Sequence, residues 1–412
     1  MRASPAGVRR DLRFSRADGS IVSEWWFTFD RVLLTALVTL VGVGVILSLA
    51  ASPAVAIKKG LPAFYFAERH IGFAAVGVMA MLVVSLLSPR GVRRLALVLF
   101  AVSLVAMVAV LATGDEINGA RRWLRIGGFS LQPSEFAKPG FAVLIAWALA
   151  ESERRPDMPG LAFACVFLAI FAALLVAQPD IGQTLLISAV WAALFVLSGQ
   201  SMLWAAGLVG LGCAGLGAAY VMMPHVTARI DKFLAPLPGD NTQLDRAYQS
   251  FTEGGFLGRG PGEGTIKTVL PDAHTDFIFA VVAEEYGAVA CLAILLLFAV
   301  VVLRPLMRAI VVRDGFIRHG STALALLIGL QALINMSVNV GLIPAKGMTL
   351  PFISAGGSST LAVSITCGML LALTRRRPDA ARLKMPGLAA NADAHAPRDL
   401  RSGGAFQRDP TR

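Results

Sequence analysis

Long apolar runs are the feature that most constrains this chain. A helix needs about 20 mostly apolar residues to cross the hydrocarbon core of a bilayer. Ten stretches approach or reach that length: residues 32–51, 71–88, 93–112, 131–150, 159–177, 181–198, 202–223, 277–303, 320–340 and 355–374. The sequence therefore predicts an all-α, polytopic membrane protein with about ten transmembrane helices.

Composition excludes a soluble fold of the same length. A chain of 412 residues could form two or three soluble domains. Only 15% of these residues are charged, however, and 56% are hydrophobic. Soluble globular chains have about 25% charged residues. This chain therefore has too little charge to cover a soluble surface of its size.

Basic residues in the connections predict the orientation. Cytoplasmic connections of membrane proteins carry an excess of Lys and Arg. With a cytoplasmic N-terminus, 24 of the 37 Lys and Arg fall on the cytoplasmic side. An even number of spans also places the C-terminus there. The net charge of +11 then reports topology, and we expect no nucleic-acid partner.

This orientation divides the chain into three parts. Residues 1–31 form a cytoplasmic N-terminal tail, residues 32–374 the membrane domain, and residues 375–412 a basic cytoplasmic tail whose composition predicts disorder. The longest connection, residues 224–276, is a large periplasmic loop between spans 7 and 8. Loops of that length are usually functional or disordered.

Ionisable groups at membrane depth are costly, so each is a candidate site residue. The first cluster opens the fourth stretch with Gln132, Glu135 and Lys138. Glu135 and Lys138 are three residues apart and share one helix face. A structural ion pair that closes the helix start is the alternative to a functional role.

Three arginines precede this cluster on the outer side, against the charge rule. They are Arg121, Arg122 and Arg125. Anion binding would explain basic residues on that side of the membrane, and Arg122 is our candidate.

The second cluster lies where the long outer loop enters the eighth span. Asp276 follows Asp272 and His274, and Glu284 and Glu285 lie two turns deeper. A lone aspartate at a helix start most often caps the helix. The company of four ionisable groups favours a functional site instead.

The third cluster joins the last two spans. Asn335 and Asn339 are four residues apart and share a face, and Lys346 lies in the connection. Ser358 belongs to Gly356–Ser359, which opens the last span, where free backbone N–H groups could bind an anion. Close helix packing through small residues is the alternative.

Other motifs of chemistry are missing from the sequence. The glycines of residues 254–264 have no strand–turn–helix context, and no Gly-Lys-Ser/Thr follows them, so no nucleotide site is expected. No HExxH, GxSxG or paired CxxC motif occurs either, and no metal-ligand cluster is evident.

Taken together, the three clusters resemble the SEDS family, the FtsW/RodA/SpoVE membrane proteins of bacterial cell-wall synthesis. The resemblance is collinear and rests on residues 118–123, 132–138, 178–183, 254–260, 270–287 and 335–359. Within the family, residues 344–351 are similar to the FtsW form, which has Lys where Lys346 stands. The sequence departs from the usual pattern at Pro139 and Ala355.

The resemblance implies a peptidoglycan glycosyltransferase that polymerises lipid II into glycan strands during septal cell-wall synthesis. The acceptor 4-hydroxyl attacks the anomeric carbon of a donor glycan on undecaprenyl pyrophosphate, and the pyrophosphate leaves. Asp276 matches the family's essential aspartate and would act as general base, with Lys138 as the cation that keeps it ionised. Arg122 and Lys346 would hold the pyrophosphate.

The remaining expectations complete this reading. The substrate-binding residues would be Arg122, Gln132, Glu135, His274, Asn339, Lys346 and Ser358, supported by Glu284 and Glu285. No cofactor is evident, although a divalent Mg²⁺ or Mn²⁺ could bridge the pyrophosphate. The family implies an inner-membrane location at the septum, with an FtsI-like class B penicillin-binding protein and other divisome proteins as partners. The alternatives are a lipid II flippase, a RodA-type elongation polymerase and a non-catalytic scaffold.

Overall fold

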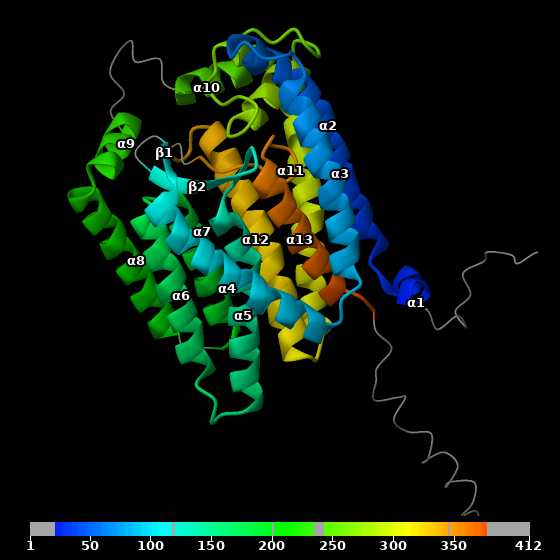
Figure 1. The fold of residues 1–412 in the computed structure, drawn as a ribbon, viewed down its shortest axis with the longest axis vertical. Coiled ribbons are helices and arrows are strands. Elements are labelled where there is room, and N and C mark those ends of the chain that lie inside the picture. The colour runs from blue at the N-terminus through cyan, green and yellow to red at the C-terminus, as the bar shows by residue number, and fades with distance from the viewer. Residues whose placement is uncertain (1–20, 118–119, 200–201, 235–242, 345–346, 377–412) are drawn as a thin grey trace, which may run out of the picture. The chain divides into compact units, whose positions relative to one another are not determined.

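A computed structural model of the chain describes residues 21–117, 120–199, 202–234, 243–344 and 347–376. Each of the ten apolar stretches coincides with a helix, so the all-α class is confirmed (Figure 1). These helices are α2 (Arg31–Lys58), α3 (Tyr65–Ser85), α4 (Pro89–Thr113), α5 (Pro133–Arg154), α6 (Gly160–Ala177), α7 (Ile181–Leu197), α8 (Met202–Met222), α11 (Ile278–Val311), α12 (Gly315–Asn339) and α13 (Gly357–Leu373).

Six of these helices are long and apolar enough on their own to cross a membrane: α2, α3, α4, α6, α11 and α12. Helices α7 and α13 are shorter, at 17 residues each. Helix α5 carries charged residues at both ends. The chain is therefore an integral membrane protein, and the count of ten crossings stays a prediction.

Shorter elements occupy the tail and the outer connections. Helix α1 (Ile21–Thr28) precedes the first span, and α9 (Pro224–Leu234), α10 (Gln243–Gly254) and the 3₁₀ turn η1 (Ile266–Thr268) lie in the large loop. The basic tail after residue 376 lies outside the described residues.

A small antiparallel sheet between α4 and α5 was not predicted. Strands β1 (Asp115–Ile117), β2 (Ala120–Ile126) and β3 (Phe129–Leu131) pair in sequence order. Gly127 and Gly128 join β2 to β3 with φ values of 55° and 81°. Two consecutive positive φ values are what a two-residue hairpin turn requires. The all-α prediction thus missed a local β meander outside the helices.

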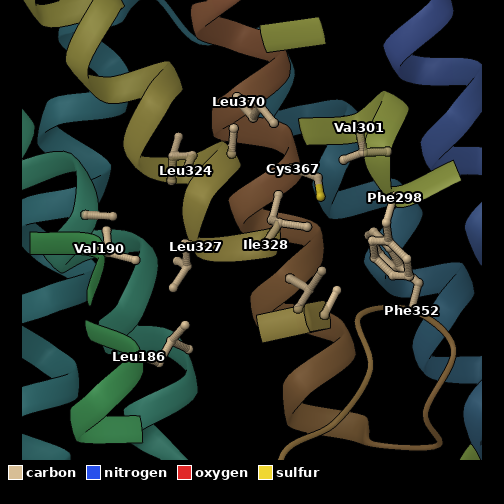
Figure 2. Packing of buried hydrophobic residues seen from close by; sticks show 14 of the residues in the cluster. Leu186, Val190, Phe298, Val301, Leu324, Leu327, Ile328, Phe352, Cys367 and Leu370 are labelled. Carbon is tan, nitrogen blue, oxygen red and sulfur yellow. The ribbon is translucent and has the colours of Figure 1, made fainter. Parts of the chain in front are cut away.

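Helix α12 is at the centre of the core. It packs against α5, α7, α11 and α13, and α3 packs on α13. Figure 2 shows Leu324, Leu327 and Ile328 of α12 between α7 and α13, with Phe298 and Val301 of α11 nearby. Association of helices in a membrane depends on close van der Waals packing rather than on a hydrophobic force between them.

Small residues bring several of these helices into backbone contact. A Cβ at Gly140 of α5 would lie 2.8 Å from the carbonyl oxygen of Ala96 in α4. A Cβ at Gly368 of α13 would lie 2.7 Å from the carbonyl oxygen of Met81 in α3. A side chain larger than hydrogen would force these helix pairs apart.

Helix α11 is broken at Gly287, where φ is 73° and ψ is −178°. The large loop hydrogen-bonds to the backbone that the break exposes. Arg259 N donates to Glu284 O at 2.9 Å, and Ala288 N donates to Gly255 O at 2.9 Å. The break therefore produces a short first segment, residues 278–286, that the loop holds in place.

The glycines of the loop permit this contact. A Cβ at Gly254 would lie 1.8 Å from the carbonyl oxygen of Ala283, and one at Gly258 would lie 2.2 Å from that of Glu285. Only glycine lets two backbones approach so closely. Gly254 and Gly258 therefore serve the packing of the large loop against α11.

We expect Gly258→Ala to destabilise the protein more than Gly262→Ala. Both glycines have positive φ, 81° and 86°, so both variants carry about 1–2 kcal/mol of backbone strain. Only Gly258 has backbone atoms within 4 Å of the added Cβ. Overpacking there should cost about 2 kcal/mol more. Thermal unfolding of the two variants in detergent measures the difference, and equal midpoints would contradict the close approach.

Candidate active site

Asp276 lies in the turn that leads from the large loop into α11. The carbonyl oxygen of Asp272 accepts hydrogen bonds from the backbone N–H of Thr275, Asp276 and Phe277 at 3.0, 3.1 and 3.3 Å. Phe277 occupies the N-cap position, and among the described residues the side chain that binds the first turn of α11 is that of Asn339, not that of Asp276. The capping alternative for Asp276 is therefore wrong, and its carboxylate is available for another role.

Two asparagines of α12 fix the backbone of Asp276. The Nδ2 atoms of Asn335 and Asn339 each donate to the carbonyl oxygen of Asp276 at 2.9 Å. Asn339 Oδ1 also accepts a hydrogen bond from Ala280 N at 3.0 Å. The shared face predicted for the two asparagines thus points at Asp276, and Asn339 is a support of the turn.

The Asp276 carboxylate borders a small cavity of about 30 Å³. The cavity is lined by Gln243, Asp276, Phe277, Asn335, Val338, Gly347 and Met348. The carboxylate accepts no hydrogen bond within the described ranges. Burial, together with the charge of Asp272, raises the pKa of Asp276 to about 7. A carboxylate in such a place can take up a proton near neutral pH.

His274 lies two residues before Asp276 and is 6% exposed. Its ring centroid lies 4.4 Å from that of Phe66, and its carbonyl oxygen accepts a hydrogen bond from Ala355 N at 2.9 Å. Burial and the charge of Lys59 together lower the pKa of His274 to about 4, although the charge of Asp272 acts in the opposite direction. The imidazole is therefore neutral at pH 7, and its backbone ties the Asp276 turn to the segment before α13.

Lys138 does not pair with Asp276. Its Nζ lies 2.9 Å from Glu135 Oε1 and donates to Gln331 Oε1 at 2.9 Å. Gln183 Nε2 of α7 donates to the same glutamate at 2.8 Å. Among the described residues Lys138 forms an ion pair with Glu135 alone. The expectation that Lys138 would hold Asp276 ionised is corrected: Glu135 neutralises its charge.

An indirect path does join Lys138 to the Asp276 turn. Gln331 Nε2 donates to Thr349 O at 3.1 Å, and Asn335 Nδ2 donates to Met348 O at 2.5 Å. Asn335 is also a partner of Asp276. Residues 348–356 are not helical, and backbone of that kind is tolerated in a membrane protein when protein groups satisfy it. Here the side-chain amides of Gln331 and Asn335 in α12 donate to the carbonyl oxygens of Thr349 and Met348.

Arg122 braces the turn between α6 and α7. Its guanidinium donates to the carbonyl oxygens of Gln178 and Pro179, and Nη1 lies 3.6 Å from Asp180 Oδ2. Burial raises the pKa of Asp180, and the Arg122 charge opposes that rise. The sequence predicted that Arg122 would bind the pyrophosphate. That prediction is corrected, because hydrogen bonds and an ion pair within the protein engage this arginine.

The other two arginines also have acidic partners. Arg125 Nε lies 2.9 Å from Asp115 Oδ2, and Arg121 Nη2 lies 3.7 Å from Glu116 Oε2. Residues 121 and 125 share one face of β2, and residue 122 lies on the other. The three arginines of the predicted outer side thus pair with nearby carboxylates, so their presence in this segment needs no bound anion.

The remaining predicted residues are dispersed. Gln132 is the N-cap residue of α5 and makes no capping side-chain hydrogen bond. Ser358 is buried in the first turn of α13, 6% exposed. Lys346 lies outside the described residues.

Glu284 and Glu285 hold the large loop rather than border the cavity of Asp276. Glu284 is fully buried and accepts hydrogen bonds from Ile266 N at 2.6 Å and Lys267 N at 2.9 Å. Glu285 pairs with Lys267 Nζ, with both side chains nearly inaccessible. Sequence reasoning missed Lys267. The signal was present, because two adjacent buried glutamates need a cation or several donors.

These features define a polytopic helical membrane protein with a partly buried aspartate at the end of a broken helix. The chain belongs to the FtsW/RodA/SpoVE family, since the family model described as a cell cycle protein matches residues 31–378. The SEDS resemblance of the sequence is thereby confirmed.

Relatives and solved structures agree with this assignment. A probable peptidoglycan glycosyltransferase FtsW of Caulobacter vibrioides (strain NA1000 / CB15N) is 46% identical over 368 residues, 89% of this chain and 94% of that protein. One from Halorhodospira halophila (strain DSM 244 / SL1) is 35% identical, over 84% of this chain and 90% of its own. A chain from a peptidoglycan synthase complex is 28% identical with a TM-score of 0.69, covering 84% and 97%. The Rod shape determining protein RodA of Thermus thermophilus is 26% identical with a TM-score of 0.63, covering 86% and 99%.

We expect Lys267→Met to destabilise the protein by about 3–5 kcal/mol, because it leaves the Glu285 carboxylate buried without a partner. Glu285→Gln in the same chain should recover much of that loss by removing the charge. Arg259→Met is the matched control, since its ion pair with Glu253 is exposed, at 36% and 46%. Surface pairs of this kind contribute about 0–1 kcal/mol. Equal unfolding midpoints for Lys267→Met and Arg259→Met would contradict this role for Lys267.

Proposed function

We propose that this protein is a peptidoglycan glycosyltransferase that polymerises lipid II, with Asp276 as the general base. The observation that carries the proposal is the Asp276 carboxylate, held by its backbone at the head of α11 and free of side-chain partners among the described residues. The family and the printed names of the relatives, probable peptidoglycan glycosyltransferases, supply the substrate class.

The chemical part of the protein in this reaction is limited to proton transfer. The acceptor 4-hydroxyl loses its proton to Asp276 as its oxygen attacks the anomeric carbon of the donor sugar. The bond from that carbon to the pyrophosphate oxygen breaks, and undecaprenyl pyrophosphate leaves with the electron pair. A base is most effective when its pKa lies near the operating pH. The pKa of about 7 for Asp276 meets that condition.

The leaving pyrophosphate needs positive charge nearby. We keep Lys346 as a candidate, and we assign Arg122 instead to bracing the α6–α7 turn. Within the described residues, no group of three or more His, Cys, Asp or Glu side chains is placed to hold a metal ion. We therefore expect any Mg²⁺ or Mn²⁺ that takes part to be held mainly by the pyrophosphate oxygens.

Two rival functions share much of this structure. A lipid II flippase would use polar groups near the membrane midplane, and the Glu135–Lys138–Gln331 network is the feature that favours it. A scaffold for a transpeptidase would need no uncommitted carboxylate at all. Purified protein in detergent with lipid II separates the three, because sidedness is lost there. Glycan strands formed in that system exclude flipping or scaffolding as the whole function.

The cellular setting of the proposal follows the family. We propose an inner-membrane location at the division septum, and the FtsW names of the relatives favour division over elongation. A class B penicillin-binding protein is the expected partner, because a similar chain was solved in a peptidoglycan synthase complex.

We expect Asp276→Ala and Asp276→Asn to abolish strand synthesis while the protein still folds, because the asparagines bind the backbone of Asp276 and not its side chain. In the unmodified protein the rate should fall as the pH drops through about 7, since the base is then protonated. At pH 5 it should be about a hundredfold below its plateau.

Asp272→Asn is the matched control for Asp276. Asp272 is exposed and its charge raises the pKa of Asp276, so this variant should stay active with its acidic limb moved to lower pH. Strand synthesis by Asp276→Asn would contradict the assignment of Asp276 as the general base.

We expect Lys138 to act as a positioning residue through Gln331. The double variant Lys138→Met, Glu135→Gln removes both charges of the buried pair and should reduce the rate without moving the acidic limb. A cation in direct contact with Asp276 would lower its pKa, so losing it would move the limb to higher pH. A pH–rate profile of the double variant decides between the two roles, and an upward shift would restore direct pairing.

A further inference from the structure

The cavity beside Asp276 has one more polar side chain than the proposed base requires. Of its lining, Phe277, Val338 and Met348 are apolar. The Asn335 amide donates to two backbone carbonyl oxygens, those of Asp276 and Met348. Gln243 is different: in the described part of the chain its half-buried amide forms no hydrogen bond.

Gln243 reaches this cavity from a distant part of the chain because α10 is fixed on α11. Gly254, at the end of α10, lies against the backbone of Ala283. The rings of Phe251 and Phe279 lie 5.9 Å apart. Figure 1 shows α10 at the end of the helices where α11 begins. This mounting places the first residue of α10 over Asp276.

A further bond holds α10 to the loop that carries Asp276. Arg246, one turn after Gln243, donates to the carbonyl oxygen of Val269. Helix α10 is therefore held from two sides, by α11 and by the residues that follow η1. Gln243 keeps its place at the cavity without using its own side chain.

We propose that Gln243 contacts the acceptor saccharide and orients its hydroxyl toward Asp276. This inference rests on the proposed function and adds a substrate-contacting residue to it. A glutamine amide offers two donor hydrogens and an acceptor oxygen on one plane. A hexose ring offers hydroxyls on neighbouring carbons. One hydroxyl can thus face the carboxylate while an adjacent group pairs with the amide.

The size of the cavity agrees with an arrangement in which one hydroxyl faces the carboxylate and an adjacent group pairs with the amide. About 30 Å³ is more than one water molecule needs, so a hydroxyl group fits beside the carboxylate. We therefore place one hydroxyl of the acceptor in this cavity, beside Asp276. The Gln243 amide, which lines the same cavity, offers a second point of contact, and one is needed because a single hydrogen bond leaves the ring free to rotate.

The first test compares two glutamines of the same helix. Gln243→Ala should lower kcat/KM for lipid II polymerisation about tenfold, the effect of losing one hydrogen bond to the substrate. Gln249→Ala is the matched control, since Gln249 is exposed on α10 and does not line the cavity. It should keep the original kcat/KM. Unfolding midpoints of both variants should equal that of the unmodified protein.

The second test asks whether the side chain faces the carboxylate. Gln243→Glu places a second negative charge in the cavity and should move the acidic limb of the pH–rate profile to higher pH. Of the described titratable groups, Asp272 is the other one whose charge reaches Asp276, and it is unchanged in this variant. Gln249→Glu should leave the limb where it is. A residue that only supports α10 would not produce this difference.

The outcomes separate this inference from the proposed function. If Asp276→Asn is inactive and Gln243→Ala polymerises lipid II at the original kcat/KM, the role of Gln243 is wrong and the proposed function stands. If Gln243→Glu leaves the acidic limb unmoved, the role is also wrong. If Asp276→Asn polymerises lipid II, the proposed function fails first.

Discussion

The hydrogen-bonding needs of irregular backbone inside a membrane protein determine how this site is built. Residues 270–277 and 348–356 are not helical, yet many of them are buried between helices. Unsatisfied N–H and C=O groups are costly in such a place. Helix α12 meets the need with carboxamides at Gln331, Asn335 and Asn339, four residues apart along one face. The two segments also bond to each other, since Ser354 Oγ donates to Thr275 O at 2.5 Å.

A consequence of this arrangement is that the base is separated from the buried cation. Lys138 is neutralised by Glu135, and its remaining partner is a neutral amide. Among the residues that the structure describes, Asp276 is bound through its carbonyl oxygen and not through its carboxylate. If the lysine had paired with Asp276 directly, the pKa of that aspartate would be lower, and the carboxylate would be a weaker base. The neutral side-chain amides of α12 therefore fix the position of Asp276 without placing a charge beside it.

The sequence predicted the parts of this protein that depend on local pattern. Runs of apolar residues located the ten helices, and the four-residue spacing of Asn335 and Asn339 predicted their shared face. Contacts between distant segments could not be predicted. Lys267 looked like an ordinary loop residue, because its partner Glu285 becomes buried only when the loop folds onto α11. Arg122 looked free, because the strand that turns it away from Arg121 and Arg125 was not anticipated.

The contacts between the large loop and α11 meet at the break in α11. An unbroken helix of 34 residues would satisfy its own backbone and leave the large loop no backbone groups to bind in the middle of the helix. Because Gly287 interrupts it, backbone groups on both sides of the break bond to residues 255–260, and Glu284 and Glu285 hold η1. The loop then continues for only a few residues before it reaches Asp276. The position of the carboxylate is thus set from both directions along the chain, by η1 before it and by the short first segment of α11 after it. Both are held at the same break, so the geometry of the base depends on the backbone at Gly287 as much as on the amides of α12.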